Sequence, residues 1–292
     1  MIDVLIGALL ALIMFSIGLG LQRADFRQLV AAPGVVLLGL CLQLMWLPLL
    51  AFGVASALKL PAAFAVGTVV LAACPGGLTS NFISYLLRAR TSLAVSLTIC
   101  NTTLSLLTIP LLVNLGLRAF GGAGSAVRLP FMDTAGRLFL VVLVPVFLGM
   151  LFRARARVRA EKIGAGLRYV NVGLLALLFA IKLFAPTEAG GSPLSLTDIR
   201  TILPASLLIN AGALLGGYCF GRLAGFGRNT QLTLGVEVGI QNTSLAFLIT
   251  GTLLGDQEML KPALVYAMFT FFTALGYGVW LKPGSLRRAL RG

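Results

Sequence analysis

The sequence has 292 residues, of which 58% are hydrophobic and only 11% are charged. A soluble globular domain has about 25% charged residues, so the composition excludes a soluble enzyme and also a disordered or fibrous protein. Long apolar stretches recur between short polar connectors, and a helix needs about 20 such residues to cross a bilayer core roughly 30 Å thick. The composition therefore predicts an all-α polytopic membrane protein.

The net charge of +14 does not indicate a nucleic-acid partner, because the basic residues lie at the ends of apolar segments and form no basic face with interleaved aromatics. The absence of histidine excludes histidine-based catalytic triads and HExxH zinc sites. Cys41, Cys74, Cys100 and Cys219 lie inside apolar segments without CxxC spacing, which favours small buried residues over disulfides or metal ligands. We expect no cofactor other than coupling ions.

Nine apolar segments, separated by charges and turn residues, predict nine transmembrane helices. They cover approximately Asp3–Leu21, Gly34–Ala57, Pro61–Leu87, Thr91–Leu117, Phe131–Leu151, Tyr169–Phe184, Thr201–Leu223, Thr230–Leu254 and Pro262–Leu281. With the N-terminus outside, 16 of the 23 basic residues fall on the cytoplasmic side and 7 outside, as the positive-inside rule requires. We expect one monomeric transmembrane unit (1–292) in the inner, plasma membrane, with the C-terminus in the cytoplasm.

Two of the segments contain helix-breaking sequences at mid-membrane depth. In the third, Cys74–Asn81 combines a proline, which removes a backbone donor, with two glycines that release helical geometry. In the eighth, Gly235–Ser244 places glycines on both sides of Glu237, followed by a possible cap set, Asn242-Thr243-Ser244. One such break alone favours an ordinary kink. Unwound backbone at this depth is tolerated only inside protein or beside a water-filled cavity.

The two breaks occupy corresponding places in the chain. If 1–117 and 169–281 are two four-helix units joined by a connecting helix (131–151), each break lies in the third helix of its unit. The lone amides Gln43 and Asn210 lie in the second helix of each unit. The odd connecting helix gives the units opposite orientations. Paired broken helices in an inverted repeat predict the binding site of a secondary transporter at the bilayer midplane.

Glu237 is the one acidic residue deep inside a predicted span, where an ionisable group costs at least about 2.5 kcal/mol. No Lys or Arg occupies a corresponding mid-membrane position. A carboxylate beside unwound carbonyls, Gln241 and Gln43 forms an all-oxygen site that suits a small hard cation. A protonated Glu237 in a proton-coupled carrier is the alternative. On the fourth segment, Thr98 and Asn101 favour a wall of this site, whereas Ser105 favours interhelical hydrogen bonding.

Three ordered motifs carry a family resemblance: Cys74–Asn81, Tyr85–Arg88 and Val236–Ala246. With them, and in layout over essentially the whole chain, the sequence resembles the bile acid:sodium symporter family. The resemblance implies two sodium sites behind crossing broken helices. It also implies a core (segments two to four and seven to nine) that moves against a panel (segments one, five and six). Some bacterial relatives have ten helices, and we expect this chain to lack the first.

The resemblance also assigns ligands by position. The first sodium site would use Ser80, Asn81, Thr98 and Glu237. The second would use Gln43, Glu237, Gln241 and the carbonyls of Val238 and Ile240. Two departures are visible: Ala94 stands where relatives can offer a hydroxyl to the first sodium, and Phe269-Thr270 stands where bacterial relatives can have a His-Asn pair near the substrate.

The substrate class follows from the restarted half-helices at Thr79–Asn81 and Asn242–Ser244. Their N-terminal ends carry free N–H groups and the positive end of the helix dipole, which favour an anion. The family includes carriers of bile acids, pantoate and other organic acids, so we expect an organic carboxylate. The candidate substrate-binding residues are Thr79, Asn242, Thr243, Asn210 and Thr270. A proton-coupled carrier and a passive carrier or channel are the alternatives; an enzyme lacks the necessary catalytic groups.

Overall fold

The computed structural model describes residues 2–22, 30–121, 128–186 and 191–283, and all regular elements in these ranges are helical. The first half contains α1 (Ile2–Gly20), α3 (Pro33–Cys41), η1 (Leu42–Trp46), α4 (Leu47–Ala57), α5 (Ala62–Ala73), α6 (Leu78–Leu86) and α7 (Thr91–Phe120). The second half contains α8 (Phe131–Leu138), η2 (Phe139–Leu143), α9 (Val144–Arg155), α10 (Arg157–Phe184), α11 (Leu196–Leu223), α12 (Arg228–Gly239), α13 (Thr243–Phe247), η4 (Leu248–Leu253) and α14 (Lys261–Leu281).

Seven continuous helical stretches in the described residues are long and apolar enough to cross a membrane. They are Pro33–Ala57, Thr91–Phe120, Phe131–Arg155, Arg157–Phe184, Leu196–Leu223, Arg228–Leu253 and Lys261–Leu281. The other two predicted segments contain shorter apolar helices, Ile6–Gly20 and Ala62–Ala73. The prediction of an all-α membrane protein is confirmed, and the count of nine spans stays a prediction.

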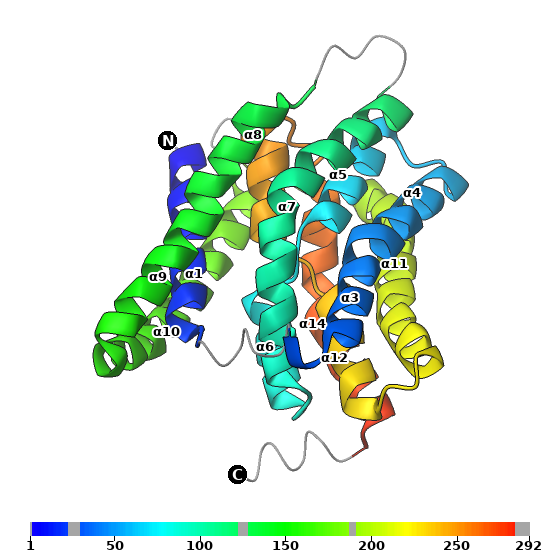
Figure 1. The fold of residues 1–292 in the computed structure, drawn as a ribbon. Coiled ribbons are helices and arrows are strands. Elements are labelled where there is room, and N and C mark those ends of the chain that lie inside the picture. Colours follow the sequence, from blue (N-terminus) through cyan, green and yellow to red (C-terminus); the bar gives the residue numbers. More distant parts are fainter. Residues whose placement is uncertain (1, 23–29, 122–127, 187–190, 284–292) are drawn as a thin grey trace.

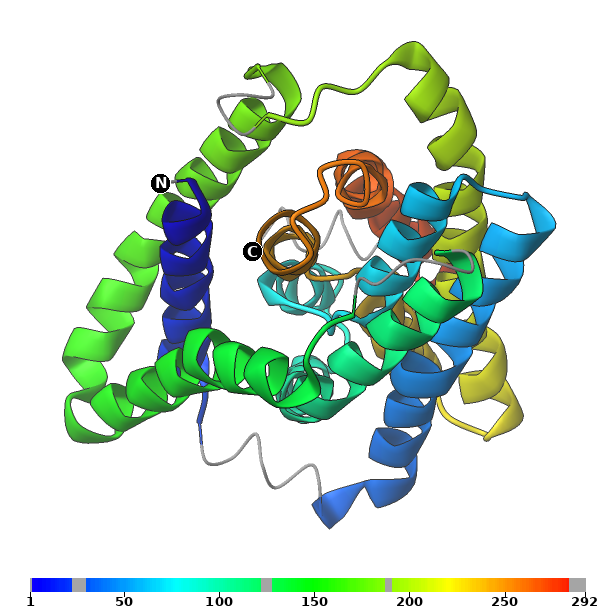
Figure 2. The same ribbon diagram turned by 90° about the horizontal axis from the view of Figure 1, so that it is seen from above.

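The helices pack as two groups. In the three-helix group, α1 lies against α9 and α10; in the main group, α3 to α7 pack with α11, α12 and α14. Figure 1 shows α1, α9 and α10 on one side of the molecule, and Figure 2 shows the same separation from above. The described contacts between the groups include α8 and η2 against α7, and α1 against α13 and η4.

Close backbone contact inside each group depends on paired glycines. A Cβ atom on Gly18 of α1 would collide with the Val146 carbonyl of α9, and one on Gly149 would collide with the backbone of α1. In the main group, a Cβ atom on Gly217 of α11 would collide with the backbone of Gly235 in α12. Small residues at such contacts allow tight helix packing in membranes, so each group is internally well packed.

The basic segment after the fifth predicted span is helical. The predicted spans Phe131–Leu151 and Tyr169–Phe184 leave residues 152–168 as a connector, but α9 extends to Arg155 and α10 begins at Arg157, with only Ala156 between them. The Arg157–Glu161 ion pair, at 3.1 Å and four residues apart, contributes to this helix start. This α9–α10 connection lies at the end of the molecule where α14 finishes (Figure 1). Arg23, Arg27, Glu188 and the basic residues after 283 lie outside the described residues.

Candidate functional site at the crossing of two broken helices

The two predicted breaks lie against each other in the main group. α5 ends at Ala73 and α6 begins at Leu78, so Cys74–Gly77 is non-helical, as the proline and glycines predicted. The second break is narrower than the sequence predicted: it covers residues 240–242, between α12 and α13. The backbone N–H of Asn242 donates to the carbonyl of Pro75 at 2.9 Å. The breaks therefore meet through a main-chain hydrogen bond.

The expected unwinding at Gly235–Gly239 is wrong, because these residues form the end of α12. Their glycines serve close packing instead of flexibility. A Cβ atom on Gly235 would collide with the Tyr277 ring, and one on Gly239 would lie 2.6 Å from the Leu214 side chain. Glu237 consequently lies on a helical turn of α12.

Each restarted half-helix has a polar group near its first turn. Ser80 Oγ accepts from the Gly77 N–H at 3.3 Å and donates to the Gly77 carbonyl at 2.8 Å. Asn242 Oδ1 accepts from the Leu245 N–H at 3.0 Å, as an N-cap does. Both half-helices therefore begin at the crossing, with their positive dipole ends there.

The carboxylate of Glu237 is completely buried beside the first break. Its Oε1 lies 2.5 Å from Thr98 Oγ1, which also lies 3.0 Å from the Ala94 carbonyl and 3.4 Å from Asn81 Oδ1. One hydroxyl hydrogen thus faces three oxygen acceptors. Glu237 Oε2 has no hydrogen-bond partner, and no ion pair forms at Glu237, among the described residues.

Gly76 brings the first break directly onto this carboxylate. A Cβ atom there would lie 2.7 Å from Glu237 Oε1 and 3.1 Å from Ser80 Oγ. The structure therefore brings together the four residues predicted for the first cation site: Ser80, Asn81, Thr98 and Glu237. An excess of oxygen acceptors around an unpaired carboxylate fits a hard cation. Ala94 contributes a buried methyl group where a hydroxyl would add another oxygen.

The predicted second group is centred on two amides. Gln43 Nε2, on the π-helical turn η1, donates to the Cys74 carbonyl at 2.9 Å and to Gln241 Oε1 at 3.0 Å. Gln241 Nε2 donates to the Val238 carbonyl at 2.6 Å. Gln43 Oε1 is buried without a partner among the described residues. The described contacts of the Glu237 carboxylate are with the first group.

Asn210 occupies a different place from the other predicted substrate residues. Its Nδ2 donates to the Gly239 carbonyl at 2.8 Å and lies 3.2 Å from the Tyr266 hydroxyl, which donates to the same carbonyl at 2.8 Å. Asn210 thus binds the last carbonyl of α12. Sequence reasoning missed Tyr266, because nothing in its local sequence places it at this helix end.

A cavity of about 190 Å³ lies beside the crossing. Its polar lining includes Thr79, Thr243, Thr270 and Gln241. Leu175 and Phe179 of α10 and Phe271 of α14 contribute apolar lining. The structure therefore gathers three of the five predicted substrate residues at one cavity, between α10 and the main group. The α10 wall was not predicted, since its residues have no distinguishing sequence pattern.

Asn242, a fourth predicted substrate residue, caps α13 with its side chain at the edge of the crossing. Phe269, at the first position of the Phe269-Thr270 departure from bacterial relatives, packs against Tyr266 with ring centroids 5.6 Å apart.

On α7, the prediction that Ser105 forms an interhelical hydrogen bond is wrong, because its hydroxyl donates to the Thr102 carbonyl of its own helix at 2.7 Å. Asn101 is buried with neither amide atom paired among the described residues.

Residues 8–188 match the family model described as the Sodium Bile acid symporter family. The chain belongs to this family. The matched region contains the first break and Thr98 but ends before Glu237.

Three relatives illustrate the similarity. The "Uncharacterized sodium-dependent transporter YocS" of Bacillus subtilis is 32% identical over 241 residues, which are 81% of this chain and 70% of the relative. The "Probable sodium/metabolite cotransporter BASS2, chloroplastic" of Oryza sativa is 32% identical over 240 residues, 82% of this chain and 55% of the relative, so the chain spans about half of that protein. The "Ileal sodium/bile acid cotransporter" of Homo sapiens is 29% identical over 285 residues, 94% of this chain and 77% of the relative. The chain is a membrane transport protein of this family and not an enzyme.

Proposed function

We propose that the protein is a sodium-coupled symporter of an organic anion that works by alternating access. The observation that supports this most strongly is the Glu237 carboxylate, which is fully buried where the two broken helices cross and has one oxygen without a partner among the described residues. A buried carboxylate without a basic partner either takes up a proton or binds a cation. The neutral oxygens around it favour a cation.

Sodium is proposed to bind at two neighbouring groups of oxygens. The first consists of Ser80, Asn81, Thr98 and Glu237. The second consists of Gln43, Gln241 and the carbonyls of Val238 and Ile240, with Glu237 as the shared ligand. The unpartnered Gln43 Oε1 supports a ligand role for this amide. Because Ala94 has no hydroxyl group to offer as a ligand, the first site is expected to bind sodium more weakly than the second.

The substrate is proposed to bind in the cavity beside the crossing. Its carboxylate would lie against the N-terminal ends of the half-helices, near Thr79, Asn242 and Thr243, where the positive ends of the helix dipoles favour an anion. Its apolar body would face Phe179 and Phe271. The cavity volume is below the roughly 300–1,000 Å³ of typical ligand pockets, which favours a smaller carboxylate such as pantoate over a bile acid.

The proposed architecture is an inverted repeat of 1–117 and 169–281, joined by the helix at 131–151. Two corresponding contacts support it: Gln43 donates to the Cys74 carbonyl, at the start of the first break, and Asn210 donates to the Gly239 carbonyl, the last of α12 before the second break. We propose that the main group is the core and that the three-helix group is the panel. We propose that the protein is a monomer with nine spans in the inner membrane. In the proposed orientation the N-terminus lies outside.

A thermal-shift screen of purified protein tests this function. Pantoate, other short carboxylates and bile acids are each measured in sodium and in potassium at equal ionic strength. A coupled substrate raises the melting temperature more in sodium, because linkage between two ligands is reciprocal. Stabilisation by a carboxylate that is equal in sodium and potassium would contradict sodium coupling.

A further inference from the structure

A much smaller cavity lies inside the main group, next to the second break. Its volume is about 10 Å³, and its lining comes from α4, α5, α11 and α14 and from Gln241. Gln241 also lines the cavity proposed for the substrate, so one amide borders both spaces. Roughly 10–15 Å³ of free space is the least that a bound water needs. The smaller cavity therefore has room for one water-sized molecule.

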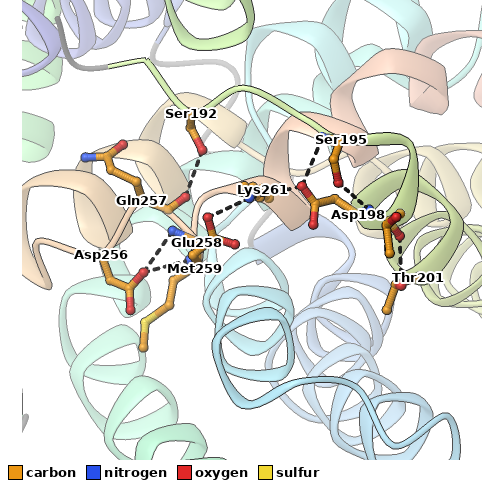
Figure 3. Close-up of polar contacts among 10 residues, drawn as sticks. Ser192, Ser195, Asp198, Thr201, Asp256, Gln257, Glu258, Met259 and Lys261 are labelled. Atoms are coloured by element: carbon orange, nitrogen blue, oxygen red, sulfur yellow. Dashed lines mark hydrogen bonds and ion pairs between the residues drawn. The ribbon is translucent and has the colours of Figure 1, made fainter. Parts of the chain in front are cut away.

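The hydroxyl of Ser206 has no hydrogen-bond partner among the described residues, although Ser206 is only 4% exposed. Serine and threonine hydroxyls inside helices often donate to the carbonyl four residues earlier. Thr201, on the same helix, donates in this way to Thr197 at 2.8 Å (Figure 3), and Thr68, which also lines the cavity, donates to Phe64 at 2.7 Å. Ser206 lines the cavity without such a bond, so its O–H group is available to a molecule inside it.

The other polar side chains at the cavity offer oxygen acceptors. Thr68 uses its hydrogen within α5, and the Tyr266 hydroxyl donates its hydrogen to the Gly239 carbonyl. Gln241 Oε1 accepts one hydrogen bond, from Gln43 Nε2, and an amide oxygen can accept two. The cavity therefore presents several oxygen acceptors together with one free O–H donor.

A water molecule matches this set of groups. Water donates two hydrogens and accepts others, and a buried water typically makes about three hydrogen bonds. None of the described residues that line the cavity is acidic, so a cation there would be buried without a counter-charge, which is costly. Water satisfies the Ser206 hydroxyl and the free acceptors without burying a charge.

The cavity is closed toward the predicted outer face. Asp198, Ile202 and Ser206 follow one face of α11 at four-residue spacing. Ile202 and Phe64 belong to one buried apolar cluster. At the end of α11, Lys261 pairs with Asp198 at 3.0 Å, and its Nζ lies 5.9 Å from the centre of the Phe64 ring (Figure 3). A molecule in the cavity is therefore enclosed by an apolar layer and an ion pair.

We propose that this cavity binds one water molecule between Ser206, Thr68 and Gln241, and that Ser206 acts through this water to position the Gln241 amide for sodium. The positioning role rests on the function proposed above, in which Gln241 is a ligand of the second sodium site. A water bonded to Gln241 Oε1 fixes the direction of that oxygen. Ser206 and Thr68 themselves bind neither sodium nor substrate.

A structure determined in potassium, with maps that show ordered water, tests the binding site itself. The expected result is a peak within hydrogen-bond distance of Ser206 Oγ and Gln241 Oε1. The absence of this peak from a map that shows other buried waters would refute the site. A peak that appears only in sodium would identify a bound ion and would also contradict the proposal.

Sodium titrations followed by melting temperature test the positioning role. Ser206→Ala should raise the sodium concentration that gives half-maximal stabilisation about fivefold, the size expected for one hydrogen bond between neutral groups. Ser206→Thr keeps a hydroxyl and should restore the wild-type value. Thr201→Ala is the matched control, since it removes a hydroxyl that bonds the backbone of the same helix, and it should leave the value unchanged. A purely structural Ser206 would lower Tm equally in sodium and potassium with no change in the sodium concentration required, and this result would overturn the positioning role.

The two experiments separate this inference from the proposed function. If sodium does not stabilise the wild type, the proposed coupling fails and the positioning role fails with it, whereas the peak in potassium still decides the water site. If sodium stabilises the wild type and Ser206→Ala at the same concentrations, the positioning role alone is overturned.

Discussion

Replacing Glu237 by glutamine tests the proposed sodium site with little change in shape. The substitution keeps an oxygen near Thr98 Oγ1, which lies 2.5 Å from Oε1 in the wild type. It removes the negative charge and turns the unpartnered Oε2 position into an N–H₂ donor. Because no ion pair is formed at Glu237 among the described residues, folding should survive.

The expected magnitude follows from the charge that is lost. Two unit charges 4 Å apart attract by about 4 kcal/mol at an effective dielectric constant of about 20. If about half of this survives the cost of desolvating the ion, the substitution weakens sodium binding by about 2 kcal/mol, or roughly 30-fold. At sodium concentrations about 100 times the wild-type Kd, ligand stabilisation is about 2.7 kcal/mol, and 30-fold weaker binding leaves about 0.9 kcal/mol.

The assay is a melting series in sodium and in potassium at matched ionic strength. With roughly 2 °C per kcal/mol for a chain of this size, the sodium-induced rise in Tm should fall from about 5 °C to about 2 °C in Glu237→Gln. Gln43→Ala should reduce the sodium-induced rise in Tm less, since it removes a neutral ligand. Its Tm should be lower than that of the wild type in both salts, because the substitution removes two hydrogen bonds. An undiminished sodium effect in Glu237→Gln would refute the shared-ligand reasoning and favour proton coupling.

Three further predictions concern the first sodium site, the substrate and the orientation. Ala94→Ser adds a hydroxyl one turn from Thr98 and should raise the sodium-induced Tm shift; a shift no larger than in the wild type would contradict an ion site there. Thr79→Leu and Asn242→Leu should reduce carboxylate uptake while sodium stabilisation persists; unchanged uptake kinetics in both would place the substrate elsewhere. A cysteine at Thr197 should react with an impermeant maleimide in intact cells and one at Arg157 should not; the reverse pattern would invert the topology.

The first break was predictable because its cause is local. Pro75 lacks a donor and the two following glycines lack side chains, and the structure unwinds at these residues. The second break was predicted too broadly. Glycine indicates both unwinding and close packing, and at Gly235 the deciding fact is the ring of Tyr277, which is distant in sequence. Only the packed structure distinguishes these two uses of glycine.

The parts of the site that sequence reasoning missed are long-range contacts. Tyr266 meets the end of α12, and Phe179 reaches the cavity from α10, through helix packing that no local pattern encodes. The bond of Gln43 to the Cys74 carbonyl is similar, although the lone amide was itself a correct signal of importance. The charged residues of 152–168 form the end of α9 and the start of α10, although the sequence predicted a connector there, because charge density indicates exposure and not the absence of a helix.

Uptake by proteoliposomes tests the central claim most directly. Radiolabelled pantoate and a radiolabelled bile acid are offered in turn to vesicles with an inward sodium gradient, with an inward proton gradient in sodium-free buffer, or with neither. The account predicts accumulation above the external concentration only with the sodium gradient, and loss of that accumulation in Glu237→Gln. Accumulation driven by the proton gradient alone, or mere equilibration whichever gradient is applied, would contradict it.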